Sequence, residues 1–108
     1  MKQHAIAIAI TLAALASAGS AAATEHVVAQ KGKAFAVKKL SVKVGDSVKF
    51  VNEDPFSHNV FSLSDAKSFD LGSYGQGGAK SVTFDKAGTV EVECAVHPDM
   101  KLIVEVSK

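Results

Sequence analysis

The residues best suited to chemistry stand close together near the C-terminal end, in the heptapeptide CAVHPDM, residues 94–100. This stretch holds the one cysteine of the chain, one of its four histidines and one of its two methionines. Cys94, His97 and Met100 occupy its positions 1, 4 and 7, and a tight loop of that length can turn these side chains toward one point. A thiolate, an imidazole and a thioether are ligands for soft metal ions, so the spacing predicts a metal site.

A fourth donor has to come from elsewhere in the chain. His58, in the stretch DPFSHNVFS, stands well before the heptapeptide and beside a predicted strand. A β-sandwich can place that strand next to the one that carries Cys94. Two imidazoles, a thiolate and a weak thioether form the trigonal set with a long axial ligand that suits copper in an electron-transfer site.

Plainer roles are open to each of these residues. A lone inward cysteine commonly acts as a small buried hydrophobe, and His58 could be a surface residue that precedes a strand. Met100 could simply fill the core at the start of the last strand, which would leave copper with three protein ligands or with a bound water. We assign no role to His26, which we expect to be solvated near the start of the domain.

The N-terminal segment predicts export. Residues 1–4 carry one lysine, residues 5–18 form an unbroken apolar run, and small residues up to Ala23 fit a cleavage site. The run is too short to span a bilayer comfortably, although a membrane anchor or a buried N-terminal helix is the alternative. Neither a twin-arginine pair nor a lipid-attachment cysteine is present, so general secretion to the periplasm is expected. We therefore divide the chain into a signal peptide, residues 1–23, and one domain, residues 24–108.

The composition of the domain excludes several classes of function. Acidic and basic residues nearly balance, with a net charge of +1 for the whole chain, so no basic surface for nucleic acid is expected. One cysteine cannot form a disulfide within the chain, and a free thiol in an oxidising compartment has to be buried, paired between chains or bound to a metal. The glycine-rich stretch 71–78, LGSYGQGG, lacks the lysine and helix of a phosphate-binding loop and predicts a flexible loop.

Alternation of apolar and polar residues with a period of two dominates the domain and predicts strands rather than helices. Turn signals such as Gly45-Asp46 and the stretch DKAG separate these strands. The predicted strands cover residues 40–44, 48–50, 82–84, 90–94 and 102–106. This pattern indicates an all-β Greek-key sandwich or barrel, in which Cys94 points inward at the end of its strand.

Together these segments resemble the cupredoxins, the small blue-copper proteins of the plastocyanin and amicyanin kind. The resemblance runs from about residue 35 to residue 106, through VKVGDSVKFVNED, SHNV, FDKAGTVEVEC and the C-x-x-H-x-x-M loop. The short loop, including Pro98 after the histidine, is most similar to amicyanin. The resemblance implies a cupredoxin fold with one copper per chain, held by His58, Cys94, His97 and Met100. It also implies that the Asn59 side chain bonds to the ligand loop, although a turn-forming asparagine is the alternative.

The function implied by the resemblance is that of a periplasmic one-electron carrier, with His97 as the electron exit near the surface. Transient redox partners are expected, such as a c-type cytochrome, a quinoprotein dehydrogenase, or an oxidase or reductase. We expect a monomer without a membrane anchor after cleavage. An enzyme is not expected, because no set of nucleophile, base and orienting residue is visible.

A non-redox role is the alternative function. The domain could store or deliver copper, or it could hold zinc as a structural ion. Zinc binds cysteine and histidine readily but prefers four good ligands in a tetrahedron, and a thioether is a poor fourth.

Overall fold

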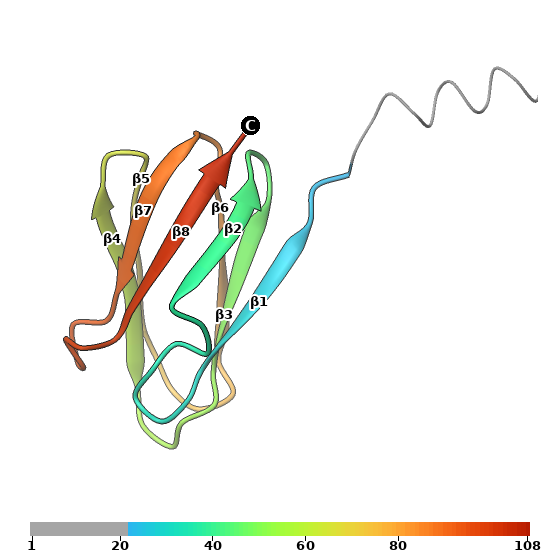
Figure 1. Ribbon diagram of the computed structural model, residues 1–108. Helices are drawn as coiled ribbons and strands as arrows, with labels where there is room; N and C mark the ends of the chain where they lie inside the picture. The colour runs from blue at the N-terminus through green and yellow to red at the C-terminus, as the bar shows by residue number, and fades with distance from the viewer. Residues whose placement is uncertain (1–21) are drawn as a thin grey trace, which may run out of the picture.

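The protein consists entirely of strands and connecting loops over the residues that the structure describes. The computed structural model describes residues 22–108, so nearly all of the signal peptide predicted for residues 1–23 lies outside the described part. Within residues 22–108 no helix is long and apolar enough to cross a membrane. The strands are β1 (Glu25–Gln30), β2 (Lys39–Lys43), β3 (Ser47–Asn52), β4 (His58–Ser64), β5 (Lys67–Tyr74), β6 (Ala79–Thr83), β7 (Gly88–Glu93) and β8 (Lys101–Ser107) (Figure 1).

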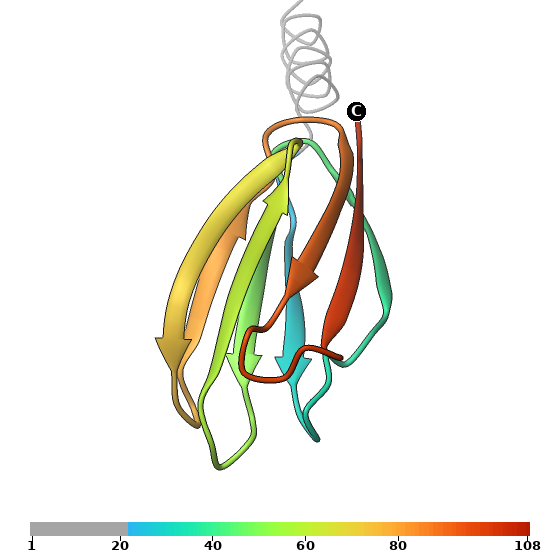
Figure 2. The ribbon, with the colours of Figure 1, turned by 90° about the vertical axis from the view of Figure 1, so that its left-hand side faces the viewer.

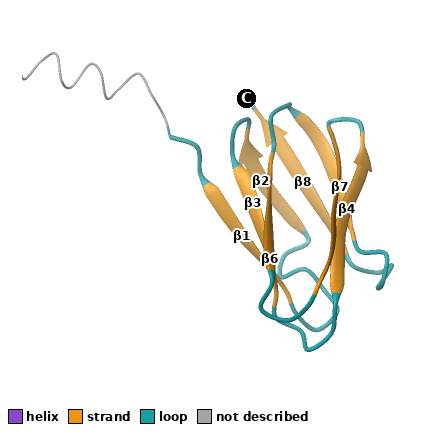
Figure 3. Cartoon of the chain, turned by 180° about the vertical axis from the view of Figure 1, so that it is seen from behind, coloured by secondary structure: helices purple, strands orange, loops and turns teal. Residues whose placement is uncertain are grey.

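These strands form two sheets that pack face to face, as Figure 2 shows. One sheet has the order β1-β3-β6 and the other the order β2-β8-β7-β4-β5. Pairing is parallel between β1 and β3 and between β2 and β8, and antiparallel elsewhere. Seen from behind in Figure 3, only loops and turns join the strands. The predicted all-β sandwich is therefore confirmed.

The core between the sheets comes from the inward half of each alternating strand. In β7, Val90 and Val92 are fully buried while Thr89, Glu91 and Glu93 lie toward the outer face. Each apolar side chain buried in this way stabilises the fold by about 1.5–3 kcal/mol. The buried apolar residues are Val28, Phe35, Val42, Val48, Phe50, Val60, Val82, Phe84, Val90, Val92, Cys94, Met100, Leu102, Val104 and Val106.

Two parts of the sequence fold differently from expectation. Half of the stretch predicted as a flexible loop, residues 71–78, belongs to β5, and only residues 75–78 connect it to β6. A register shift between Asn59 and Phe61 of β4 accommodates the region around Gly72, whose φ of 75° favours glycine. This irregularity hides the period-two pattern of β5, because a bulge displaces the alternation by one residue.

His26 is the second correction. It lies in β1, which was not predicted, and its Nε2 is 3.0 Å from Oδ2 of Asp46. Its side chain is 24% exposed, so His26 is not a freely solvated residue. This contact with Asp46 holds β1 beside the β2–β3 turn.

Strand direction alternates along the chain, and this places four connections at one end of the sandwich. They are the β1–β2, β3–β4, β5–β6 and β7–β8 connections, which lie at the lower end in Figures 1 and 2. The β2–β3 turn and Lys108 lie at the opposite end. Every predicted copper ligand is found at the lower end.

Candidate metal centre

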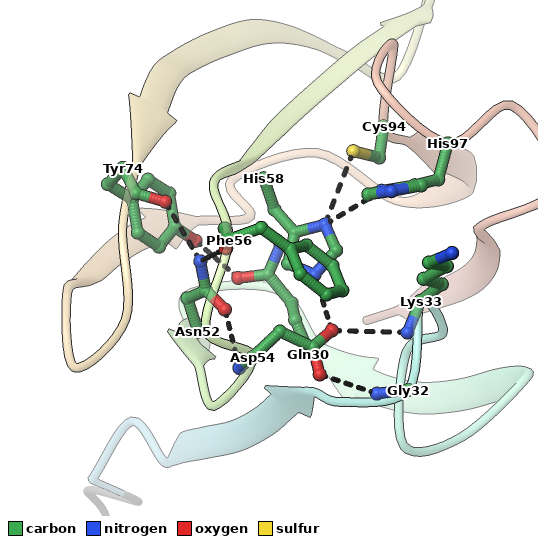
Figure 4. A network of polar contacts seen from close by, with 10 residues as sticks. All are labelled: Gln30, Gly32, Lys33, Asn52, Asp54, Phe56, His58, Tyr74, Cys94 and His97. Atoms are coloured by element: carbon green, nitrogen blue, oxygen red, sulfur yellow. Dashed lines mark hydrogen bonds and ion pairs between the residues drawn. The ribbon is translucent and has the colours of Figure 1, made fainter.

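The structure brings three of the predicted ligands together. His58 is the first residue of β4, Cys94 follows the last residue of β7, and His97 lies in the β7–β8 loop. Their ligand atoms all lie within 4.8 Å of one another. His58 Nδ1 is 3.8 Å from Cys94 Sγ and 3.2 Å from His97 Nδ1, as the dashed lines in Figure 4 show. The adjacency of β4 and β7 in one sheet accounts for this meeting, because Phe61 pairs with Glu93.

Burial differs among these side chains in a way that suits a site with one open edge. His58 is 0% exposed and Cys94 is 1% exposed, whereas His97 is only partly buried. Met100 is 1% exposed and stands immediately before β8. Its backbone N–H donates to the carbonyl of His97 at 2.9 Å, which closes the end of the ligand loop. Among the candidate ligands, only His97 reaches the surface.

Asn59 follows His58 in β4 and contacts the ligand loop. Its Oδ1 accepts a hydrogen bond from the backbone N–H of Ala95 at 2.7 Å. Ala95 is the residue after Cys94, so the bond ties the loop to the strand that carries the other buried ligand. The structure thus shows a bond from Asn59 to the ligand loop, and the role of Asn59 in supporting a metal site stays a prediction.

Asp54, in the β3–β4 loop, contacts the far side of the His58 ring. Its Oδ2 lies 2.7 Å from His58 Nε2. The carboxylate also accepts hydrogen bonds from the backbone N–H groups of Gly32 at 2.7 Å and Lys33 at 3.1 Å. Burial works to raise the pKa of Asp54, but the hydrogen bonds from His58, Gly32 and Lys33 outweigh it and lower the pKa to about 2. The group is therefore a carboxylate at neutral pH.

Buried amide groups shape the loop that carries Asp54. Asn52 is 0% exposed; its Nδ2 donates to the carbonyls of Phe56 and Tyr74 at 2.8 and 2.9 Å, and its Oδ1 accepts from the N–H of Asp54 at 2.8 Å. Asn52 thus satisfies the hydrogen-bonding groups of the backbone of a tight turn from the inside.

The hydroxyl of Tyr74 donates a hydrogen bond to the carbonyl of Phe50 at 3.0 Å. Burial raises the pKa of Tyr74 above its ordinary value, with a smaller contribution from Cys94.

Phe56 covers the two imidazoles on the outer side. Its ring centroid is 5.3 Å from those of both His58 and His97, and the two histidine rings are 4.9 Å apart. Lys33 Nζ lies 5.8 Å from the centroid of the Phe56 ring. The aromatic ring therefore packs against both histidines while remaining 36% exposed itself.

Sequence reasoning missed Asp54, Asn52 and Phe56. One signal was available: the stretch NEDP contains an asparagine two residues before an aspartate, which is the spacing of an Asx turn. The contact of Asp54 with Gly32 and Lys33 joins loops that are distant in sequence, and periodicity carries no information about such a contact.

The donor set is suited to copper. One thiolate and two imidazole nitrogens are soft or intermediate ligands, and no carboxylate is among the three atoms that converge. His58 and Cys94 are withdrawn from solvent, which limits exchange and oxidation of the thiol. The buried Met100 adds a thioether at the end of the same loop.

Comparisons with known proteins agree with this chemistry. Residues 22–107 match the family model of copper-binding proteins of the plastocyanin/azurin family. The chain is 34% identical over 83 residues to amicyanin from Paracoccus denitrificans, and 32% identical over 69 residues to the methylamine utilization protein MauL from Methylorubrum extorquens. These matches cover 66% and 63% of this chain, and 58% and 60% of the relatives, so the chain spans less than two thirds of their length.

Solved structures give the same result. A reduced Cu(I) form of an amicyanin variant at pH 4 has a TM-score of 0.72 and 30% identity, with 83% of this chain and 89% of that one covered. The Cu-containing nitrite reductase from Thermus scotoductus SA-01 also has a TM-score of 0.72 and 30% identity, covering 78% of this chain and 22% of the reductase.

A two-sheet sandwich that gathers a buried cysteine and two histidines at one end is a cupredoxin. This chain belongs to the plastocyanin/azurin family of copper-binding proteins. The resemblance drawn from the ligand spacing is confirmed, and copper is the cofactor that the His58, Cys94 and His97 centre is built to hold.

Proposed function

We propose that the protein is a one-electron carrier with a single type 1 copper centre. The observation that carries the proposal is the convergence of Cys94 Sγ with one ring nitrogen each of His58 and His97, all within 4.8 Å of one another, at one end of the sandwich. Copper bound there would supply a Cu(II)/Cu(I) couple. One electron arrives from a reduced partner and leaves to an oxidised one, and no atom is transferred.

The chain contributes a fixed and partly shielded ligand cage. His58 is held by β4 and by Asp54, and Cys94 by the end of β7, so these ligands have little freedom to move when the charge of the site changes. A cage that keeps one geometry lowers the reorganisation that each electron transfer requires. We assign Met100 as the weak axial ligand, supported by its burial and its place at the end of the ligand loop.

Electrons would enter and leave through His97. It is the only one of these ligands that is not fully buried, and Phe56, Val96 and Pro98 flank it on the surface. Val96 is 55% exposed, and the charged residues Lys33 and Asp99 line the same depression, so the rim around His97 offers a partner protein both apolar and charged contacts. The partners proposed are a c-type cytochrome, a quinoprotein dehydrogenase, or an oxidase or reductase. The names of the relatives, amicyanin and a methylamine utilization protein, favour a partner in amine oxidation.

We further propose that the carrier works in the periplasm, as a monomer formed by residues 24–108 after removal of residues 1–23. The apolar N-terminal run and its small-residue end support the cleavage. A carrier is favoured over an enzyme because four protein donors, with Met100 included, leave no position on the metal for a substrate.

Colour provides the test of this function. The protein purified with copper should show an intense absorption in the middle of the visible range, and ascorbate should bleach it reversibly with one electron per copper. A storage, delivery or zinc-binding module would stay colourless after Cu(II) is added or would fail to cycle. Zinc bound in place of copper should give a protein that has no visible band.

A further inference from the structure

We propose that Asp54 is a positioning residue for the copper centre: it fixes the His58 ring with Nδ1 toward the metal, and its negative charge lowers the reduction potential. The inference rests on the copper centre proposed above. It concerns a residue outside the ligand set, on a loop that sequence reasoning assigned no role (Figure 4).

The hydrogen bonds of Asp54 determine which nitrogen of His58 is available. A carboxylate can only accept, so the 2.7 Å contact requires the proton on Nε2. A ring that carries this single proton presents an unprotonated Nδ1, and Nδ1 is the atom that lies 3.2 Å from His97 Nδ1 and 3.8 Å from Cys94 Sγ. Asp54 therefore selects the tautomer that binds a metal before any metal arrives.

The carboxylate is itself held by an unusual piece of backbone. Gly32 and Lys33 are consecutive residues in the left-handed region, with φ of 67° and 60°, and both direct their N–H groups at Asp54. Lys33 is the only residue other than glycine with a positive φ in residues 22–108. Such a conformation costs free energy and persists where surrounding contacts require it. Here the β1–β2 loop adopts the strained conformation and binds the Asp54 carboxylate with two consecutive backbone N–H groups.

Position and burial make the charge of Asp54 effective. Asp54 is 5% exposed, and only the width of the His58 ring separates its carboxylate from the ligand atoms. A negative charge so close, with little water between, favours the more positive oxidation state of the metal. It also makes the imidazole a stronger donor. Removing the charge should weaken binding of Cu(II) more than that of Cu(I), and so raise the potential.

Asp46 provides a matched control within the same molecule. Its carboxylate accepts hydrogen bonds from the backbone N–H groups of Thr24 at 2.9 Å and Lys43 at 3.0 Å, and its Oδ2 lies 3.0 Å from His26 Nε2. This is the same arrangement of two backbone donors and one histidine around a carboxylate that is 7% exposed. It stands at the end of the sandwich opposite the copper ligands, so it shares the structural role of Asp54 without the link to the metal.

The test compares Asp54→Asn with Asp46→Asn in the full-length protein. Cu(II) affinity should fall about 10–100-fold in Asp54→Asn, and the midpoint potential should rise, by about 59 mV for each tenfold loss of Cu(II) over Cu(I) affinity. Asp46→Asn should lose stability while its potential and affinity remain those of the parent. Equal shifts in both variants, or none in Asp54→Asn, would overturn the proposal.

A second measurement needs no variant. Nitrogen-15 NMR of the metal-free parent protein at neutral pH should show the His58 proton on Nε2, and a proton on Nδ1 alone would refute the inference even if Asp54→Asn failed to fold. A parent protein with no blue copper band would instead refute the proposed function. The tautomer result does not depend on that band, so the two failures are distinguishable.

Discussion

Asn59 Oδ1 and the backbone N–H of Ala95 are 2.7 Å apart, and this bond joins β4 to the loop that carries Cys94 and His97. The two segments also meet through the register pair of Phe61 with Glu93 and through the contacts of His58 with Cys94 and His97. The Asn59 side chain thus ties the strand that holds His58 directly to the loop that holds the other ligands.

Replacing Asn59 with alanine should loosen the ligand loop. Loss of this hydrogen bond should lower the free energy of unfolding by about 1 kcal/mol and speed the release of copper to a chelator. Asn59→Asp keeps the acceptor oxygen and should recover most of the copper retention. Chelator kinetics with equal rates for the parent and Asn59→Ala would show that the bond has no part in holding the loop.

Cys94→Ser should abolish the visible absorption of the copper protein. The colour of such a site arises from charge transfer between thiolate and Cu(II), and a serine hydroxyl cannot supply it. The substitution is nearly isosteric in the buried position, so the metal-free protein should remain folded by circular dichroism. A blue band that survived would exclude Cys94 as a ligand.

Met100→Leu should leave a coloured site with a higher potential than the parent. Losing a weak sulfur donor destabilises Cu(II) more than Cu(I), and leucine fills a similar volume at little packing cost. Leu102→Met, a change of similar size at a neighbouring buried position of β8, is the control and should not change the potential. Cyclic voltammetry that finds one potential for all three proteins would contradict the axial assignment.

The hydrogen bonds that Asp46 accepts predict a specific loss of stability in acid. The hydrogen bond from His26, followed by those from the Lys43 and Thr24 amides, lowers the pKa of Asp46 to about 2. The unfolded chain would have a pKa of about 3.9 at this residue. The stabilisation is therefore complete above the unfolded value and is lost as the pH falls between about 5 and 2. Urea unfolding of the metal-free protein should show a shallower acid dependence in Asp46→Asn, and parallel curves would disprove the coupling.

Gly88, at the start of β7, should not tolerate alanine. Its φ is 146°, and an added Cβ would lie 2.8 Å from the Cβ of Ala66. Gly77 has a φ of 83° with open space around it. Gly77→Ala should therefore lower the free energy of unfolding only by the cost of the strained backbone, about 1–3 kcal/mol. Gly88→Ala should lose about 1–3 kcal/mol more from the clash. Thermal unfolding with similar losses in both variants would mean that β7 can shift away from Ala66.

Those strands that alternate cleanly were predictable from the sequence. In β7 and β8 every second residue is apolar and buried, so the periodicity carried both the fold class and the inward direction of Cys94. In β5 a bulge around Gly72 breaks the period. Strand β1 has only a short apolar stretch and lies on an edge of its sheet. Local patterns fail where pairing with a distant strand decides the conformation.

The candidate ligands were predictable for a different reason. Cys94, His97 and Met100 fall in one short loop, so their spacing alone indicates a common target. Asp54 acts through His58 and through the amides of Gly32 and Lys33, which are more than twenty residues away in the chain. Such a contact depends on tertiary placement, and no periodic or compositional signal reports it.

Both ends of the described domain are fastened to the same turn. The N–H of Thr24 donates a hydrogen bond to the Asp46 carboxylate, and the carbonyl of Ser107 accepts one from the N–H of Val44. The two ends therefore lie at the end of the sandwich opposite His97 (Figure 1). A flexible linker or an electrode surface could therefore be attached through either end while His97 stays directed outward. The same geometry would allow the domain to be joined to a longer polypeptide, and this chain aligns with 22% of the Cu-containing nitrite reductase.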